Sequence, residues 1–203
     1  MATRIIKDED FVAVLEGRSG GEGSDYYAMY SSVLDGITCN PSLMMIPVDD
    51  HVVHRGDGVF ESIKCVNGAV FNLGAHLDRL MASASKLRLV VPVTMARLQE
   101  LIIDAIRAGG HRQCSIRVLL TRGTGNMGIN PYDCKQVQLY IIIYKLSLPT
   151  MDCHPGGVRL VCSHIPAKAS FFAQIKSCNY LPNVLMSMET VDAGADFAAG
   201  FTD

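Results

Sequence analysis

The sequence predicts an α+β protein of two domains in which the second domain is incomplete. Its 203 residues suffice for one large domain or two small ones. β-rich runs come first, helical runs follow, and β-rich runs then return, which is typical of an α+β layer. Beyond a proline- and glycine-containing link at 147–157, signals remain for two strands and one helix, too few to close a core. We therefore expect a helix and flexible joint at 1–24, an α+β domain at 25–147, and a second domain beginning at 148–203, left incomplete or completed by a partner chain.

The first half of the α+β domain is predicted to consist of strands. The flexible joint "GRSGGEGSD" leads from the short N-terminal helix into the strand "YYAMYSSV", which ends at a turn at Asp35-Gly36. "MMIPV" is expected to form a short second strand. "GVFESIKCV" and "AVFNL" flank Asn67-Gly68, and Asn-Gly between two β-rich runs is a strong hairpin signal.

Two helices and two strands complete this domain. In "GAHLDRLMASASKLRL" the apolar residues recur at helical spacing and form one stripe, which consists of Leu77, Leu80, Met81, Ala84 and Leu87. A second helix, about 94–108, ends at Gly109-Gly110. The strands "CSIRVLLTRG" and "VQLYIIIYKL" follow, joined by a glycine-rich loop at 123–133 whose spacing does not match a nucleotide-binding loop.

The second domain has fewer signals. "GVRLVCSHI" is predicted to begin its strands, and residues 181–192 are predicted to form a helix with Pro182 in the first turn. "ADFAAGF" is predicted to begin a further strand.

Composition and charge exclude several classes of function. The net charge is −2, and no run of lysine or arginine suggests a nucleic-acid or membrane surface. Apolar runs such as "VQLYIII" are far too short to span a bilayer. The seven cysteines are odd in number and contain no C-x-x-C pair, which favours a reduced intracellular protein and disfavours a metal site. Because "MATRIIKDEDF" soon turns acidic, we expect neither a secretory signal nor a transit peptide, and hence a cytoplasmic protein.

One lysine stands apart from other charges. Lys176 lies in "FFAQIKSCNYLPNVLMSMET", a stiff and mostly apolar stretch. From this local sequence, the favoured interpretation is a lysine that buries its stem and keeps its amine in water. The alternative is an amine kept for covalent chemistry, since condensation with an aldehyde requires one.

Three segments in this order resemble the class IV, D-amino-acid-aminotransferase-like family of pyridoxal-phosphate enzymes, which includes branched-chain aminotransferases and aminodeoxychorismate lyases. They are "HRGDGVFESIKCVNGAVFNLGAHLDRLMASASKL", "VLLTRGTG" and "IKSCNYLPNVLMSME". The resemblance covers about residue 28 to the end. It implies a two-domain class IV aminotransferase-like fold whose C-terminal domain binds the cofactor. "AMYSSVLDGI" and "PVDDHVVHRGDGVFE" look most like the plant-type branch.

The resemblance implies roles for three residues at the cofactor. Lys176 matches the catalytic lysine that forms a Schiff base with pyridoxal 5'-phosphate and then moves a proton on the substrate. Arg79, in "HLDRL", matches the arginine that binds the phosphate, which a guanidinium can grip with two parallel hydrogen bonds. An ion pair with Asp78 or another surface carboxylate is the alternative for Arg79. Tyr180 matches a tyrosine that meets the cofactor ring oxygen in some members, and a role as a core aromatic fits equally well.

Two residues are candidates for substrate binding. Phe60 and Ser62 lie two apart on one predicted strand, so their side chains face the same way. The resemblance implies that this side of the strand lines the substrate pocket. Bacterial D-amino-acid aminotransferases have tyrosine where this chain has Phe60, so a hydroxyl donor is missing here.

The carboxylate trap of those bacterial enzymes is also missing. They carry an arginine and a histidine where this chain has Met127 and Ile129. Arg55 or Arg122 is a possible replacement, and a structural role is the alternative for each.

The resemblance implies an aminotransferase that moves an amino group between an amino acid and a 2-oxo acid. It also implies a homodimer with its site in the cleft between the domains. Relatives continue past the position of Asp203 with a glutamate for the cofactor's ring nitrogen and further phosphate donors, so we expect a truncated version of the family. The alternatives are a lyase that eliminates pyruvate from aminodeoxychorismate with the same cofactor, and a non-catalytic dimerisation or binding module.

Overall fold

The structure is a computed structural model that describes residues 6–17 and 24–201. Most of the predicted flexible joint lies outside the described residues. The elements are α1 (Asp8–Glu16), β1 (Tyr26–Ser31), β2 (Gly36–Thr38), η1 (Pro41–Leu43), α2 (His51–Arg55), β3 (Gly58–Val66), β4 (Ala69–Val70), α3 (Leu73–Lys86), α4 (Met95–Gly109), β5 (Cys114–Thr121), η2 (Pro131–Asp133), β6 (Gln138–Lys145), α5 (Thr150–Cys153), β7 (Leu160–Cys162), α6 (Ser170–Ala173), α7 (Leu181–Asp192) and β8 (Phe197–Ala199). Their order confirms the predicted α+β class.

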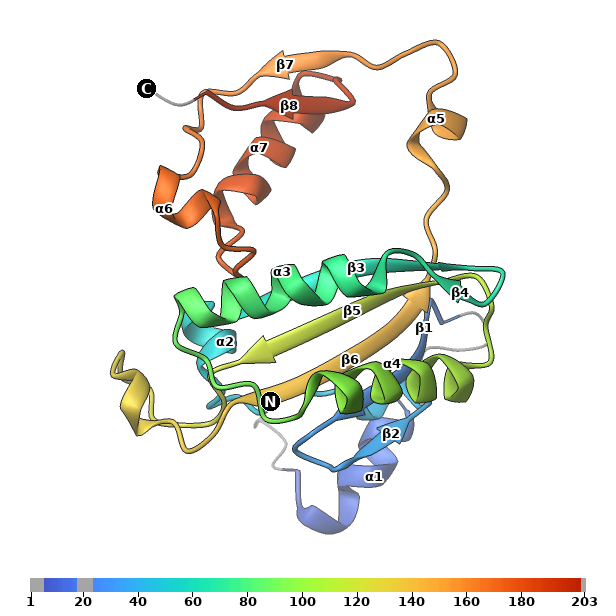
Figure 1. The fold of residues 1–203 in the computed structure, drawn as a ribbon, viewed down its shortest axis with the longest axis vertical. Coiled ribbons are helices and arrows are strands. Elements are labelled where there is room, and N and C mark those ends of the chain that lie inside the picture. The colour runs from blue at the N-terminus through green and yellow to red at the C-terminus, as the bar shows by residue number, and fades with distance from the viewer. Residues whose placement is uncertain (1–5, 18–23, 202–203) are drawn as a thin grey trace, which may run out of the picture.

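Six strands form one antiparallel sheet in the order β2-β1-β6-β5-β3-β4. β3 pairs with β5 from Gly58↔Thr121 to Cys65↔Cys114. The predicted hairpin is present between β3 and β4, where Asn67 and Gly68 both adopt positive φ, at 53° and 83°. α3 and α4 lie across one side of the sheet (Figure 1).

The main core lies between the sheet and these two helices. Three residues of the predicted α3 stripe, Leu77, Leu80 and Ala84, are buried there. They pack with buried residues of the sheet and of α4, which include Val59, Ile63, Leu98, Ile102, Ile116, Val118, Ile141 and Ile143. Each fully buried aliphatic side chain contributes about 1.5–3 kcal/mol to folding, so this layer fixes where β3 and α3 lie.

Residues 44–48, which were expected to form a strand, form none, and that prediction is wrong. β1 already pairs with β2 on one side and with β6 on the other, and Pro47 offers no backbone donor. The segment instead crosses the second side of the sheet. There Met44 and Ile46 pack against the buried cluster of Met29, Phe60, Leu119 and Tyr140.

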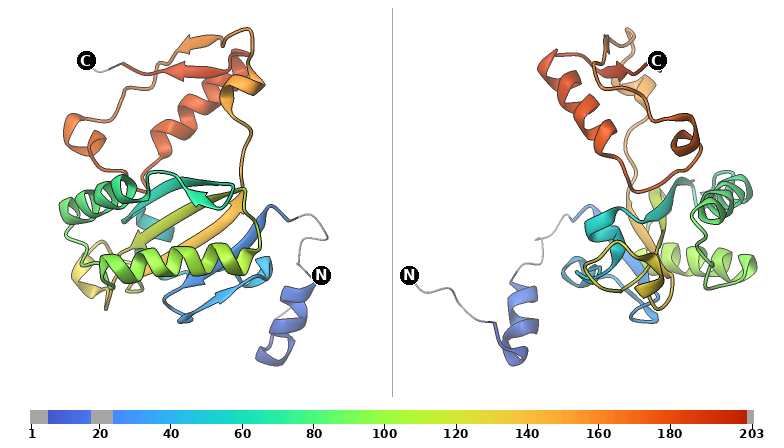
Figure 2. Two further views of the ribbon diagram at one scale, coloured as in Figure 1. Left: turned by 45° about the vertical axis from the view of Figure 1, so that its right-hand side comes forward. Right: turned by 90° about the vertical axis from the view of Figure 1, so that its left-hand side faces the viewer.

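The C-terminal lobe, residues 158–201, lies beyond the β3 edge of the sheet and is joined to the sheet by the extended link that contains α5 (Figures 1 and 2). β7 and β8 pair in parallel, from Leu160↔Phe197 to Cys162↔Ala199, and α7 packs beside them. The predicted helix at 181–192 is confirmed. The segment between α6 and α7 reaches back to the sheet (Figure 2).

No helix in 6–17 or 24–201 combines the length and apolar character needed to cross a membrane. In the same ranges, no three histidine, cysteine or acidic residues lie together in an arrangement that could hold a metal ion.

Gly123 allows the loop after β5 to pass the start of β6, and replacing it with alanine should destabilise the fold. Its φ is +92°, and a Cβ atom there would lie 1.9 Å from the backbone oxygen of Gln136. We expect Gly123→Ala to lower the free energy of unfolding by more than the ~1 kcal/mol typical of a left-handed alanine. Gly110→Ala is the control, because Gly110 has φ +72° but no atom within 4 Å of the added Cβ. Urea unfolding curves of equal midpoint for the two variants would contradict this prediction.

Candidate active site

Lys176 is attached to the sheet through its backbone. The Phe60 N–H donates to the Lys176 carbonyl at 3.0 Å, and the Cys178 N–H donates to the Gly58 carbonyl at 2.9 Å. Val59 and Ser177 form the antiparallel bridge between them. β4 pairs with β3 only at Cys65 and Val66, the C-terminal end of that strand. Residues 176–178 occupy the same edge of β3 at its N-terminal end, which β4 leaves open.

Alternation along this extended segment sends its side chains in two directions. Ile175 and Ser177 are buried, and Ile175 belongs to the main core beneath α3. The backbone N–H of Lys176 also donates to the Ser83 hydroxyl of α3, at 3.3 Å. Cys178 packs on the opposite side, with Phe60 and Tyr180.

The Lys176 amine is half-buried and lies among aromatic groups. Its Nζ donates to the Tyr180 hydroxyl at 3.2 Å. The same Nζ lies 4.4 Å from the ring centroid of Phe60 and 5.7 Å from that of Tyr180. The structure therefore brings Lys176, Tyr180 and Phe60 together, and the amine does not extend freely into water.

Arg79 is held in a fixed direction by a buried carboxylate. Its Nε and Nη2 atoms donate to Oε1 and Oε2 of Glu61, both at 2.6 Å. His76 Nδ1 lies 2.9 Å from Oε2 of the same group. The Glu61 side chain is fully buried, whereas 56% of the Arg79 side chain is exposed. The partner of Arg79 is thus Glu61, and the remaining guanidinium surface is free to meet a ligand.

The charge state of Glu61 follows from these contacts. Burial acts to raise the pKa of its carboxyl, but the hydrogen bonds and positive charge of Arg79 and His76 outweigh burial and hold that pKa below its ordinary value of 4.5. The same contact raises the pKa of Arg79 above its ordinary value.

A cavity of about 460 Å³ connects Lys176 with Arg79. Its walls come from α3, the 166–168 turn, the 173–176 segment and the start of α7. Three lining residues carry positive charge: Arg79, Lys168 and Lys176. No aspartate or glutamate is among the lining residues that the structure describes. We call this the cationic cavity.

A second hollow, of about 410 Å³, lies on the other side of Lys176. Its lining is Phe60, Ser62, Arg117, Leu119, Lys176, Cys178 and Tyr180. The two candidate substrate residues, Phe60 and Ser62, therefore share one hollow with the lysine. We call this the β3–β5 hollow.

Arg117 is a residue of this hollow that the sequence analysis did not single out. Its Nη2 donates to the Ser62 hydroxyl at 3.3 Å, and its guanidinium carbon lies 4.8 Å from the centroid of the Phe60 ring. Its buried Nε has no hydrogen-bond partner within the described part of the chain. The sequence did contain a signal for Arg117. An arginine in the apolar strand "SIRVLL" faces the same side as Leu119 and must find a polar partner.

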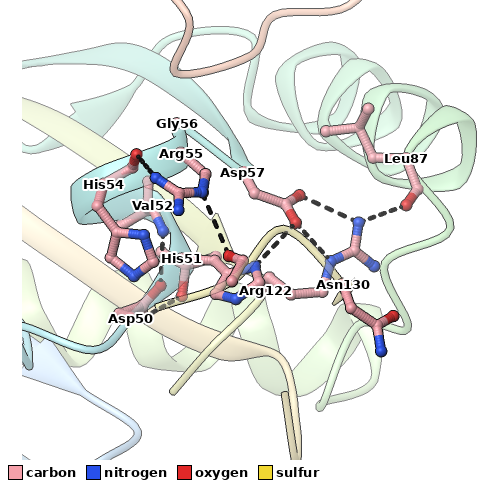
Figure 3. A network of polar contacts seen from close by, with 12 residues as sticks. Asp50, His51, Val52, His54, Arg55, Gly56, Asp57, Leu87, Arg122 and Asn130 are labelled. Atoms are coloured by element: carbon pink, nitrogen blue, oxygen red, sulfur yellow. Dashed lines mark hydrogen bonds and ion pairs between the residues drawn. The ribbon is translucent and has the colours of Figure 1, made fainter. Parts of the chain in front are cut away.

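Arg55 and Arg122 are both engaged by groups of this chain, which favours a structural role for each. Arg55 donates to the carbonyls of Gly128 and Met127, at 3.2 and 2.5 Å. Arg122 forms two hydrogen bonds with Asp57, at 2.9 and 3.0 Å, and a third with a carbonyl at the end of α3 (Figure 3). Both arginines hold the loops at this end of the sheet.

The fold and the surroundings of Lys176 are those of a known class of protein. The family model described as amino-transferase class IV matches residues 58–203. The chain belongs to the class IV aminotransferase family, as the sequence segments predicted.

Two curated relatives with similar sequences are also named as aminotransferases. The D-amino-acid transaminase, chloroplastic, of Arabidopsis thaliana is 42% identical over 173 residues, which are 85% of this chain and 46% of that protein. A putative branched-chain-amino-acid aminotransferase of Methanocaldococcus jannaschii is 32% identical over 155 residues, which are 75% of this chain and 53% of that protein. The chain spans about half the length of these relatives.

Solved structures agree in fold. The T.th. branched-chain amino acid aminotransferase with pyridoxamine 5'-phosphate has a TM-score of 0.78 and 25% identity, and the match covers 89% of this chain and 61% of that one. The same enzyme complexed with N-(5'-phosphopyridoxyl)-L-glutamate has a TM-score of 0.77 and 26% identity, with 89% and 60% covered. The predicted fold class is confirmed.

Replacing Glu61 with glutamine should destabilise the protein in a pH-dependent way. Near neutral pH, we expect Glu61→Gln to lower the free energy of unfolding by about 1.5–3 kcal/mol, the value of hydrogen bonds to a charged group. Because the folded-state pKa lies below 4.5, this stabilisation is complete above that pH and is lost as the pH falls through the folded-state pKa. The stability difference between wild type and variant should therefore shrink as the pH falls below 4.5.

Glu100→Gln is the matched control for this experiment. Glu100 also pairs with an arginine, at 2.9 Å from Arg97, but both side chains are more than half exposed. Exposed pairs contribute little to stability. Equal urea midpoints for the two variants at neutral pH would contradict the role given to Glu61.

Proposed function

We propose that this chain carries a pyridoxal 5'-phosphate site centred on Lys176, and that the protein transfers an amino group between an amino acid and a 2-oxo acid. The family assignment supports the reaction class. The observation that carries the role of Lys176 is its position on the boundary of two hollows, one cationic and one lined by Phe60, Ser62 and Arg117.

The donor groups of the cationic cavity fit the cofactor. Pyridoxal phosphate has an aldehyde, a phosphate and a ring hydroxyl, and the cavity offers an amine, a guanidinium and a phenol. Lys176 would hold the aldehyde carbon, Arg79 the phosphate, and Tyr180 the ring oxygen. When bound, the cofactor supplies an electron-withdrawing ring that stabilises negative charge at the substrate's α-carbon.

The chain's own groups prepare Lys176 for proton transfer. The hydrogen bond to Tyr180, at 3.2 Å, orients the amine, and the Phe60 ring shields one side of it from water. Pairing with β3 fixes the backbone that carries it. An amine fixed in this way and facing both hollows can take up a proton on one side and return it on the other, which is general acid–base catalysis.

Arg117 is proposed to bind a carboxylate of the substrate. Amino acids and 2-oxo acids both carry one, and a guanidinium grips a carboxylate with parallel hydrogen bonds. An Nε with no hydrogen-bond partner among the described residues and the Ser62 contact leave Arg117 in a suitable place for this role. Phe60 and Leu119, in the same hollow, favour an apolar substrate side chain.

Two alternatives remain open to direct assay. Amino transfer from alanine to 2-oxoglutarate, compared with pyruvate release from aminodeoxychorismate, distinguishes a transaminase from a lyase. A purified chain that takes up no pyridoxal phosphate would favour a non-catalytic dimerisation or binding module.

We also propose a homodimer, on the basis of the sequence resemblance, and a cytoplasmic location, on the basis of the scattered, odd-numbered cysteines. Sedimentation of the purified protein tests the first. Imaging of a C-terminally tagged protein tests the second, and the relative from Arabidopsis thaliana with its chloroplastic name makes the plastid the outcome to look for.

Lys176→Ala should abolish covalent uptake of the cofactor. After mixing with pyridoxal phosphate and borohydride, wild type should gain the cofactor's mass on the peptide that contains Lys176, and the variant should gain none there. Turnover should fall roughly 10²–10⁴-fold, because the proton-transfer group is lost. Lys135→Ala, at an exposed loop position, should behave as wild type. Turnover that survives unchanged in Lys176→Ala would exclude this mechanism.

Arg117→Met should weaken substrate binding without affecting cofactor uptake. We expect KM for both the amino acid and the oxo acid to rise about tenfold to a hundredfold, because a charge-assisted hydrogen bond is lost. Arg112→Met is the control, since Arg112 is exposed and its Nη2 donates to the Asn67 carbonyl away from the hollow. An unchanged KM for both substrates would show that Arg117 has a packing role instead.

A further inference from the structure

A second amine lies in the cationic cavity. Lys168 is half-buried, and its Nζ lies 4.5 Å from the ring centroid of Tyr180, the ring whose hydroxyl accepts a hydrogen bond from Lys176. Within the described part of the chain, Lys168 forms no ion pair. Contact with the face of an aromatic ring favours a cation but leaves its charge unbalanced.

The charges around the cavity distinguish Lys168 from the other two cations. The charge of Arg79 is matched by Glu61, which is fully buried behind it. The Lys176 amine is assigned to the cofactor's aldehyde under the proposed function. Lys168 is then the lining cation whose charge nothing in the described structure balances.

Two carboxylates of the C-terminal lobe are engaged by groups of the lobe itself. Glu189, on α7, accepts hydrogen bonds from the Ser163 hydroxyl and the His164 N–H, at 2.5 and 3.1 Å. Asp196 accepts from the Arg159 N–H at 2.7 Å. Neither residue lines the cavity.

The turn that carries Lys168 is held in place by the lobe's backbone. The Ala167 N–H donates to the Phe201 carbonyl at 2.9 Å, and the Ser163 N–H donates to the Ala199 carbonyl at 2.9 Å. These bonds extend the β7–β8 pairing and direct residues 166–168 to the cavity wall.

We infer that Lys168 is a second anion-binding residue of this site, which pairs with an anionic group of the bound ligand alongside Arg79. The inference rests on the proposed function and deepens it. The anion has two possible sources, the phosphate of the cofactor and the carboxylate of the substrate. An amine with one face against an aromatic ring is partly removed from water, so its attraction to an anion exceeds that of an exposed lysine.

The experiment compares Lys168→Met with Lys64→Met. Both changes remove an amine and keep an unbranched apolar stem. Lys64 also lies over an aromatic ring, with Nζ 5.9 Å from the Phe71 centroid, but it is exposed and lies outside the cavity. Lys168→Arg tests whether positive charge alone restores the wild-type behaviour.

Binding of pyridoxal phosphate and of pyridoxal, which lacks the phosphate, is measured by absorbance titration. If the phosphate is the partner, Lys168→Met weakens pyridoxal phosphate binding about tenfold to a hundredfold and leaves pyridoxal binding unchanged. If the carboxylate is the partner, cofactor binding is unchanged and KM for both substrates rises by a similar factor. Equal behaviour of Lys168→Met and Lys64→Met in both arms overturns the inference.

Inorganic phosphate separates failure of this inference from failure of the proposed function. Line broadening of its ³¹P resonance is followed on addition of each protein. If wild type takes up no pyridoxal phosphate but broadens the phosphate signal more than Lys168→Met does, the function is wrong and Lys168 still binds an anion. If wild type and Lys168→Met broaden the signal equally, and the wild type takes up no cofactor, the anion-binding role is excluded.

Discussion

The pairing of residues 176–178 with the start of β3 is the interaction on which the site depends. Two backbone hydrogen bonds and one bridge place the lysine against β3, a strand of the six-stranded sheet. β3 is fixed in turn by its pairing with β5 over residues 58–65 and by the core beneath α3. The backbone that carries the amine is therefore held by the sheet, although Lys176 belongs to a loop of the C-terminal lobe.

β3 also determines which polar and charged side chains face each side of the site. Consecutive residues of β3 point to opposite sides, so Phe60 and Ser62 reach the β3–β5 hollow while Glu61 reaches α3. Glu61 is buried and ionised, which is unfavourable without partners, and Arg79 and His76 provide them. One strand thus lines the proposed substrate pocket on one side and orients the proposed phosphate ligand on the other.

Much of the fold could be predicted from local sequence signals. The Asn67-Gly68 turn and the apolar stripe of α3 specify their structures through interactions between near neighbours. The strand expected at 44–48 failed because strand formation also needs an available partner edge, and β1 has none left. That information lies in the sheet order, which short-range patterns do not contain.

The residues of the site could likewise be predicted only in part. Lys176, Arg79, Tyr180, Phe60 and Ser62 were identified through resemblance to a family, and the structure brings them together. The contact of Lys168 with Tyr180 depends on the β7–β8 pairing, which joins segments far apart in the sequence, and no local pattern signals it.

The two amines of the cationic cavity, those of Lys176 and Lys168, are attached to different parts of the molecule. Lys176 is fixed to the sheet, whereas Lys168 extends from the turn after β7 in the C-terminal lobe. That lobe has a weak core of its own, since Leu181, Val184, Met188 and Val191 of α7 are all more than half exposed. The pairing of residues 176–178 with β3 attaches it to the sheet, and the 2.7 Å hydrogen bond from Lys86 to Gln174 connects it to α3. A ligand that joins Lys176 covalently and Lys168 by charge would connect the lobe to the sheet. Ligand binding would then stabilise the arrangement of the two parts as well as fill the site.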